Sequence, residues 1–228
     1  MVRHRRLILW LLTSLVSVTA CQADQPEPLV SPLDSPITAP SAADVASLIP
    51  TGSVPVDEPF VFDFDGDHVA EIAVAFTASG EQPGGGVVVG RVSGSGYSPM
   101  WQAQLPPDVK VTEFKARNML ADSTFVLLAF GQIPGTAKHP LYVYKWGQDG
   151  FYQLRPKGGK LDGQESFMSD YWPATLGDVD DDSVMEIVPT YDFDPQAEYL
   201  EPLVYQWDGI QFSYTDFYII APRFKPGK

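Results

Sequence analysis

The sequence of 228 residues carries 15 basic and 29 acidic side chains, which gives a formal net charge of −14. This charge excludes nucleic acids and anionic lipid headgroups as partners, because both are bound through basic patches. The single cysteine excludes a disulfide within the chain, so an apolar core and any bound metal must stabilise the fold. Its 21 prolines and 19 glycines leave no room for a long helix.

The first 20 residues have the plan of a cleaved export signal. Basic residues at positions 3–6 precede an apolar stretch, Leu7 to Val18, that is too short for a permanent transmembrane helix. The segment that follows resembles the bacterial lipobox, Val18-Thr19-Ala20-Cys21, in which the cysteine is diacylated and becomes the mature N-terminus. We therefore predict a lipoprotein signal peptide over residues 1–20, lipidation at Cys21, and an exported protein anchored by lipid to the extracytoplasmic face of a bacterial cell envelope. The alternatives are an ordinary signal peptide with a free thiol, or a twin-arginine signal.

The mature chain is more acidic than the whole sequence. Cleavage after residue 20 removes three arginines and no acids, which leaves 12 basic and 29 acidic side chains, a net charge of −17. Residues 21–52 are rich in Pro, Ser, Ala and Asp without an apolar period, so we predict a disordered tether there. One or two helical turns from Ser41 to Leu48, capped by Ser41, are the alternative. Residues 53–225 are enough for one domain with its own core.

Two independent features recur at one spacing along residues 53–225. The motif Val-Tyr-x-Trp occurs at 143–146 and again 61 residues later at 204–207, and a fainter copy at 87–92 lies 54 residues before the first. The two offsets add up to 115, which is also the separation of Glu71 from Glu186 in two similar acidic loops. We therefore predict three structural repeats, at about 56–115, 116–170 and 171–222.

Each repeat is predicted to contain four short strands, because β-branched and aromatic residues alternate with Gly, Asp and Pro turns. An additional strand is expected at 56–62, before the first repeat. The repeat strands are expected at 72–76, 86–92, 97–103 and 109–115; at 126–130, 141–146, 151–155 and 163–169; and at 187–191, 202–207, 212–214 and 216–220. The sequence thus predicts an all-β fold of three four-stranded repeats.

The two acidic loops, 63–71 and 178–186, place carboxylates at positions 1, 3, 5 and 9, and position 7 can add its backbone carbonyl. Ca²⁺ takes six to eight oxygen ligands, several of them anionic, whereas Mg²⁺ keeps more of its waters. Zn²⁺ and copper fit poorly, because no cysteine is present in the loops and His68 is alone. The predicted Ca²⁺ ligands are Asp63, Asp65, Asp67, the Val69 carbonyl and Glu71 in the first loop, and Asp178, Asp180, Asp182, the Val184 carbonyl and Glu186 in the second. The matching segment of the middle repeat, 117–125, lacks the three aspartates and is predicted to hold no metal.

An Asp-x-Asp-Gly-Asp-x-x-x-Glu loop that leads into an apolar strand, repeated at this spacing, resembles the FG-GAP/VCBS repeats of integrin-type β-propellers. The resemblance covers residues 56 to about 220. It implies that each repeat is one four-stranded blade and that the acidic loop binds Ca²⁺ at the edge of the blade. Carried over position by position, it selects the same ligands as the spacing of the oxygens.

The chain departs from the family pattern in three ways. At the sixth loop position, where the family usually has glycine in a positive-φ conformation, the chain has His68 and Ser183. The fourth position is Gly66 in the first loop but Asp181 in the second. Closed propellers have at least four blades, and three repeats are found here. A partial propeller, a fourth blade made by the two chain ends, and a compact β-sandwich-like unit are the alternatives.

The sequence contains no Ser/His/Asp set and no nucleophile elbow, so we predict that the protein is not an enzyme. Recurring aromatics are expected to pack the repeats (Tyr144, Trp146, Tyr205 and Trp207), whereas Trp101 and Trp172 do not recur and are alternatives for stacking on carbohydrate. The predicted function is a Ca²⁺-binding, lipid-anchored binding or adhesion module, whose partner is an envelope protein or a glycan. The alternatives are a structural or accessory subunit of an envelope complex, completed by a partner or a second copy, and a hydrolase on a β scaffold.

Overall fold

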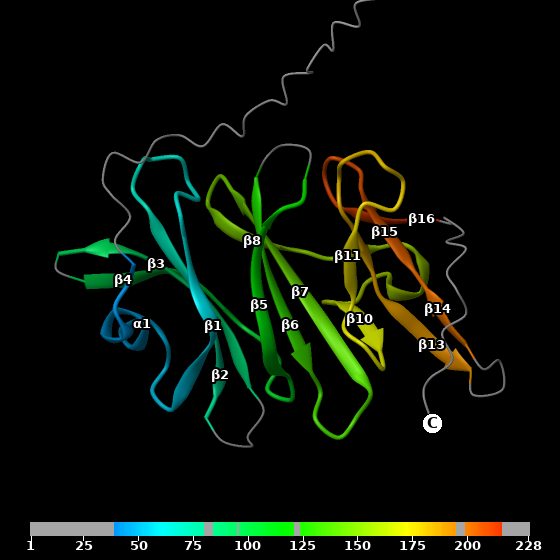
Figure 1. The fold of residues 1–228 in the computed structure, drawn as a ribbon, viewed down its shortest axis with the longest axis horizontal. Helices are drawn as coiled ribbons and strands as arrows, with labels where there is room; N and C mark the ends of the chain where they lie inside the picture. Colours follow the sequence, from blue (N-terminus) through cyan, green and yellow to red (C-terminus); the bar gives the residue numbers. More distant parts are fainter. Residues whose placement is uncertain (1–38, 80–83, 95, 121–123, 195–198, 216–228) are drawn as a thin grey trace, which may run out of the picture.

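A computed structural model of the protein describes residues 39–79, 84–94, 96–120, 124–194 and 199–215 (Figure 1). Over these residues the fold is mostly β, with one short α-helix, α1 (Ala42–Leu48), and one 3-10 turn, η1 (Gly159–Leu161). The prediction of an all-β fold is therefore confirmed. None of the described helices is long and apolar enough to cross a membrane. The predicted signal peptide and Cys21 lie outside the described residues.

Three antiparallel meanders of four strands follow one another along the chain and lie in a row in Figure 1. The first sheet contains β1 (Ser53–Phe62), β2 (Glu71–Ala78), β3 (Gly85–Ser93) and β4 (Gly96–Gln104). The second contains β5 (Lys110–Asn118), β6 (Phe125–Gln132), β7 (Lys138–Gly147) and β8 (Gly150–Leu154). The third contains β11 (Thr175–Gly177), β12 (Glu186–Val188), β15 (Val204–Trp207) and β16 (Phe212–Thr215). None of the three sheets closes on itself within the described residues.

The remaining strands extend these meanders. Strand β10 (Phe167–Asp170) pairs with β7, and β9 (Pro156–Lys157) runs parallel to β16 at the edge of the third sheet. Strands β13 (Thr190–Asp194) and β14 (Tyr199–Pro202) form a separate two-stranded sheet between β12 and β15 in the chain. The third meander is thus interrupted by a hairpin.

The predicted assignment of strands to repeats is wrong by one strand. The strand expected at 109–115, at the end of the first repeat, is β5, which pairs with β6 along Lys110–Asn118 and begins the second sheet. Each sheet therefore starts with the strand that precedes its loop, namely β1, β5 or β11. The strand expected at 163–169 is β10, which pairs with β7 and therefore belongs to the second sheet, as predicted. The strand expected at 216–220 lies outside the described residues.

The second sheet is buried on both faces. Along β6, Val126 and Leu128 belong to the apolar cluster shared with the third sheet, whereas Leu127 and Ala129 belong to the cluster shared with the first. All four side chains are fully buried. A continuous apolar run is the pattern expected for a strand that is covered on both sides. The three sheets therefore share two cores, one at each side of the middle sheet.

Helix α1 covers the face of the first sheet that points away from the second (Figure 1). Ser41 caps the helix, because its Oγ accepts a hydrogen bond from the Asp44 amide at 3.2 Å while its own amide donates to the Asp44 carboxylate at 2.9 Å. Val45 and Leu48 are buried against β2 and β3. Leu48 lies so close to Gly90 that a Cβ added there would come within 2.6 Å of it.

Residues 42–48 thus differ from the disordered tether predicted over residues 21–52, and the alternative, a helical turn capped by Ser41, is observed. Seven residues are too few to hold a helix in water without support. The support is the burial of Val45 and Leu48 against the first sheet, which the local sequence does not reveal.

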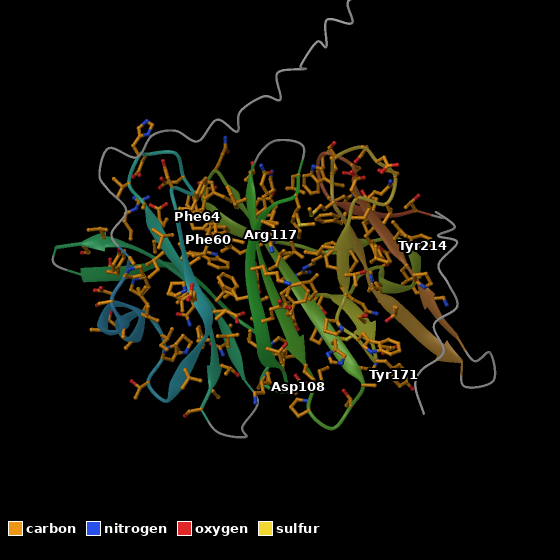
Figure 2. The ribbon with its side chains drawn as sticks, in the orientation of Figure 1. Phe60, Phe64, Asp108, Arg117, Tyr171 and Tyr214 are labelled. Atoms are coloured by element: carbon orange, nitrogen blue, oxygen red, sulfur yellow. The ribbon has the colours of Figure 1, made fainter. Side chains whose placement is uncertain are left out.

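The recurring aromatic residues pack the sheets, as predicted. Tyr144 and Tyr205 are buried, and Trp146 and Trp207 pack against the two cores. Trp101 contacts the ring of Tyr144, with ring centroids 5.1 Å apart, and therefore belongs to the core between the first and second sheets. Trp172 is exposed beside Tyr171, which Figure 2 labels near the lower end of the second sheet.

Candidate metal centres

Both acidic loops join the first two strands of a sheet, and they lie at the same edge of the molecule (Figure 1). The first loop leaves β1 after Phe62, which pairs with Glu71 on β2. The second leaves β11 after Gly177, which pairs with Glu186 on β12. The ninth residue of each loop is therefore already held in a strand, opposite the residue that precedes the loop.

In the first loop one carboxylate gathers three backbone amides. Asp63 accepts hydrogen bonds from the N–H groups of Gly66, Asp67 and His68 at 2.7, 3.1 and 2.9 Å. Gly66 and His68 have φ angles of 78° and 67°, which turn these amides inward. Asp67 in turn accepts from the Val69 amide at 2.9 Å. The loop is thus coiled around its first aspartate.

The second loop repeats this backbone. Asp178 accepts from the amides of Asp182 and Ser183 at 3.1 and 2.9 Å, and Asp182 accepts from the Val184 amide at 2.8 Å. Asp181 and Ser183 have φ angles of 63° and 70°. The positive φ predicted at the sixth position is therefore confirmed in both loops. A left-handed conformation costs a residue with a side chain about 1–2 kcal/mol, so two different sequences adopt the same strained path.

Three predicted ligands converge in each loop. One carboxylate oxygen each from Asp63, Asp65 and Glu71 lie within 4.8 Å of one another, and the same holds for Asp178, Asp180 and Glu186. Ca²⁺ binds oxygens at about 2.3–2.6 Å, so ligands on opposite sides of one ion lie about 5 Å apart. The donor set, made of carboxylate oxygens alone, therefore fits a hard cation of this size.

The other predicted ligands lie outside these groups of three. The Asp67 and Asp182 carboxylates sit in the same loops but face the amides of Val69 and Val184. Their second oxygens, together with the Val69 and Val184 carbonyls, stay predictions as ligands. The histidine next to the first site, His68, is exposed and joins no group of three potential ligands among the described residues.

The two glutamates are the buried part of each site. Glu71 accepts from the Phe64 amide at 2.8 Å, and Glu186 accepts from the Val179 amide at 2.7 Å. Burial raises the pKa of Glu71 to about 7, and the charges of Asp67 and Asp63 add to the rise while the Phe64 amide opposes it. Burial likewise raises the pKa of Glu186, with Asp180, Asp182 and Asp178 adding to it against the Val179 amide. In each site, burial and the neighbouring aspartates thus disfavour the ionised form of the glutamate.

Aromatic rings pack between the first loop and the second sheet. Phe64, the second loop residue, packs edge-on against Phe151 at a centroid distance of 5.2 Å. Phe60 and Phe62 of β1 both contact Phe125 of β6, at 5.4 and 4.3 Å. Figure 2 shows Phe60 and Phe64 at the boundary between the first and second sheets. The site is thus fixed on a rigid apolar base.

Sequence reasoning missed two residues that reach into the sites from the third strand of each meander. Arg91 of β3 forms ion pairs with Asp65, Asp67 and Glu71. Gln206 of β15 donates to Asp180 Oδ2 at 2.6 Å. Positions 91 and 206 are 115 apart and therefore equivalent in the repeat, but Arg and Gln form no recurring motif that would mark them.

The middle loop carries two buried apolar residues near its start, Met119 and Leu120, where the other two loops are acidic or turn at glycine. Met119 and Leu120 are buried in the core between the second and third sheets. The Met119 carbonyl also accepts a hydrogen bond from the Met185 amide at 3.1 Å, which ties the middle loop to the end of the second acidic loop. Met119 is thus packed in the core at the position where the other two loops have Asp65 and Asp180.

The class that fold and site define is an all-β protein of three stacked meanders, two of them with an acidic loop at the same edge. Comparison of the chain with protein-family models, with curated protein sequences and with solved structures found no match in any of the three. The functional interpretation therefore rests on the residues of the chain itself.

Without bound metal, Glu186→Gln is expected to flatten the pH dependence of stability. A carboxyl whose pKa is raised in the folded state stabilises that state fully below its unfolded value, here 4.5, and loses the contribution as the pH rises through the folded pKa. The free energy of unfolding of the wild type should therefore decrease above pH 4.5 as the contribution of Glu186 is lost, and the variant should not show this decrease. Urea unfolding at several pH values in the presence of a chelator measures the difference. Equal pH profiles would contradict the prediction.

Proposed function

We propose that the protein is a calcium-stabilised binding module built from β repeats and anchored by lipid at Cys21 to the extracytoplasmic face of a bacterial cell envelope. The observation that carries the proposal is the pair of loops 115 residues apart, which share one backbone path and one convergent set of carboxylates. The residues that would hold the ions are Asp63, Asp65, Asp67, Val69 and Glu71, and Asp178, Asp180, Asp182, Val184 and Glu186. The resemblance to FG-GAP/VCBS repeats agrees with this assignment.

In this proposal the metal is structural. Each loop closes a β hairpin, and both the first aspartate and the last glutamate already accept backbone hydrogen bonds. A bound cation would neutralise the remaining carboxylate charge and fix the first two strands of the sheet in register. Because the unfolded chain lacks the site, binding would stabilise the folded protein by mass action.

The binding role is supported by an exposed aromatic pair at the opposite edge from the loops. Tyr171 and Trp172 are 42% and 44% exposed, and their ring centroids lie 6.2 Å apart. Tyr171 has a φ of 67°, which is rare for a bulky side chain, and its amide donates to the Ala137 carbonyl at 2.6 Å. Exposed rings held in place by a strained backbone suit contact with a glycan or an envelope protein.

Calcium is expected to raise the melting temperature of the chain that starts at residue 21, with Cys21 replaced by Ser. At a free concentration 100 times the dissociation constant, the gain is about 2.7 kcal/mol, which corresponds to about 5–10 °C for a domain of this size. Thermal unfolding followed by circular dichroism, with Ca²⁺ and with a chelator, measures the shift. Mg²⁺ at the same concentration is the control and should give a smaller shift. An unchanged melting temperature with Ca²⁺ would remove the basis of the proposal.

Cys21→Ser is expected to move the protein from the membrane fraction to the soluble fraction of bacterial cells that express the full chain. Stable anchoring needs two or more acyl chains, and the variant has no residue to carry them. Fractionation followed by immunoblotting measures the distribution, and mass spectrometry of the wild type should detect the added lipid. Wild-type protein without the lipid mass would contradict the anchor.

A further inference from the structure

We propose that the positively charged side chain of Arg91 occupies the first loop in place of a metal ion. The second loop has the neutral Gln206 at the equivalent position and is therefore the loop that binds Ca²⁺ tightly. The inference deepens the proposed function and rests on it, since it assumes that the loops bind Ca²⁺. It attributes the difference in Ca²⁺ affinity between the two sites to one position on the third strand of each meander, residue 91 or 206.

Arg91 and Gln206 occupy equivalent places. Ile72 pairs with Gly90, so that Arg91 lies beside Glu71 on the neighbouring strand. Ile187 pairs with Tyr205, so that Gln206 lies beside Glu186 in the same way. Both side chains reach the aspartate at the third loop position, Asp65 in the first loop and Asp180 in the second. The two sites thus differ at this position by a full positive charge.

In the first loop the guanidinium of Arg91 forms ion pairs with carboxylates that would otherwise be available to bind a metal ion. Its Nη2 donates to Asp65 and lies 3.5 Å from the Oδ2 atom of Asp67, and its Nε donates to Glu71 Oε1 at 3.2 Å. Two of these three carboxylates, those of Asp65 and Glu71, also belong to the convergent group. An arginine side chain is always charged and presents its donors in a planar fork that matches carboxylates. A cation entering this loop has to displace it.

In the second loop the described residues supply no counter-ion for the carboxylate charge. Gln206 offers Asp180 a neutral amide, and Asp180 Oδ1 is buried without a hydrogen-bond partner. Among the described residues, no basic side chain forms an ion pair with any of the five carboxylates of this loop, Asp178, Asp180, Asp181, Asp182 and Glu186. A buried carboxylate oxygen with no partner is unfavourable, and a bound cation would relieve it. The second loop therefore gains more from a metal than the first.

The test is a calorimetric titration of Ca²⁺ into the chain that starts at residue 21 with Cys21→Ser, at pH 7.5. The wild type is expected to bind one ion tightly and a second at least about tenfold more weakly, the ratio that loss of one charge-assisted contact produces. Arg91→Gln should give two tight sites. Gln206→Arg should abolish the tight site, and the double exchange should restore one.

The location of each site is fixed by combining variants. Asp180→Asn alone should remove the tight site, whereas Asp180→Asn together with Arg91→Gln should keep one tight ion, in the first loop. Circular dichroism in chelator verifies that each variant is folded. Gln206→Arg adds a charge at a partly exposed position and keeps the test valid if Arg91→Gln fails to fold.

The two possible failures give different results. Two ions bound with equal affinity by the wild type, unchanged by Arg91→Gln and by Gln206→Arg, would overturn the inference and leave the proposed function intact. No Ca²⁺ bound by the wild type or by Arg91→Gln would overturn the proposed function, and the inference with it. A tight site that survives Gln206→Arg while Asp180→Asn still removes it would overturn the inference alone.

Discussion

Asp180→Asn is expected to remove most of the rise in melting temperature that Ca²⁺ produces, about 5–10 °C. The substitution keeps the shape of the side chain and its contact with Gln206, but removes the charge from a carboxylate whose Oδ1 atom is buried without a partner. In chelator the variant should melt at the wild-type temperature or above it, because that buried charge is gone. Thermal unfolding of the chain from residue 21, with Ca²⁺ and with chelator, measures both effects.

Asp181→Asn is the matched control for this experiment. It removes the same charge from the same loop, but Asp181 is exposed and lies outside the convergent carboxylates. Its φ of 63° is well tolerated by asparagine, so the backbone path should not change. The variant should keep most of the calcium-dependent shift. If both variants lost the calcium-dependent rise in melting temperature equally, Ca²⁺ binding would depend on the overall charge of the loop and not on a specific arrangement of ligands.

Leu128→Ala is expected to lower the free energy of unfolding by about 2–5 kcal/mol, the usual cost of deleting a fully buried leucine side chain. Leu128 is 0% exposed and lies in the core between the second and third sheets. The melting temperature should fall by about 5–15 °C for a domain of this size.

The control is Ile210→Ala, which removes similar alkyl carbons from a side chain that is 78% exposed in a turn. This variant should change stability by no more than about 0.5 kcal/mol. The three sheets should unfold in a single cooperative transition, which Leu128→Ala shifts as a whole, because the second sheet shares a core with each neighbour. Two separate transitions, only one of them shifted, would contradict the shared cores.

The parts of the structure that short-range chemistry determines could be predicted from the sequence. The two loops follow from the spacing of their acids. The positive φ observed at His68 and Ser183 is the conformation that the resemblance to FG-GAP/VCBS loops implies for the sixth position. The alternation of strands and turns correctly indicated an all-β fold. These features depend on residues no more than about ten positions apart.

Features that depend on distant residues could not be predicted. The composition of the strand at 109–115 would be the same at the end of one sheet or at the start of the next. Only its pairing with β6 assigns it to the second sheet. Arg91 enters the first site through the register of β3 against β2, 20 positions after Glu71. Helix α1 depends on a sheet surface at Gly90 that accepts Leu48. In each case the deciding contact is tertiary.

Helix α1 also limits how this architecture could grow by duplication. It occupies the outer face of the first sheet, the face on which a preceding repeat would have to stack, and its exposed side carries small and polar residues such as Ser47. An extra copy of a repeat could therefore stack on the outer face of the first sheet only if the helix were displaced.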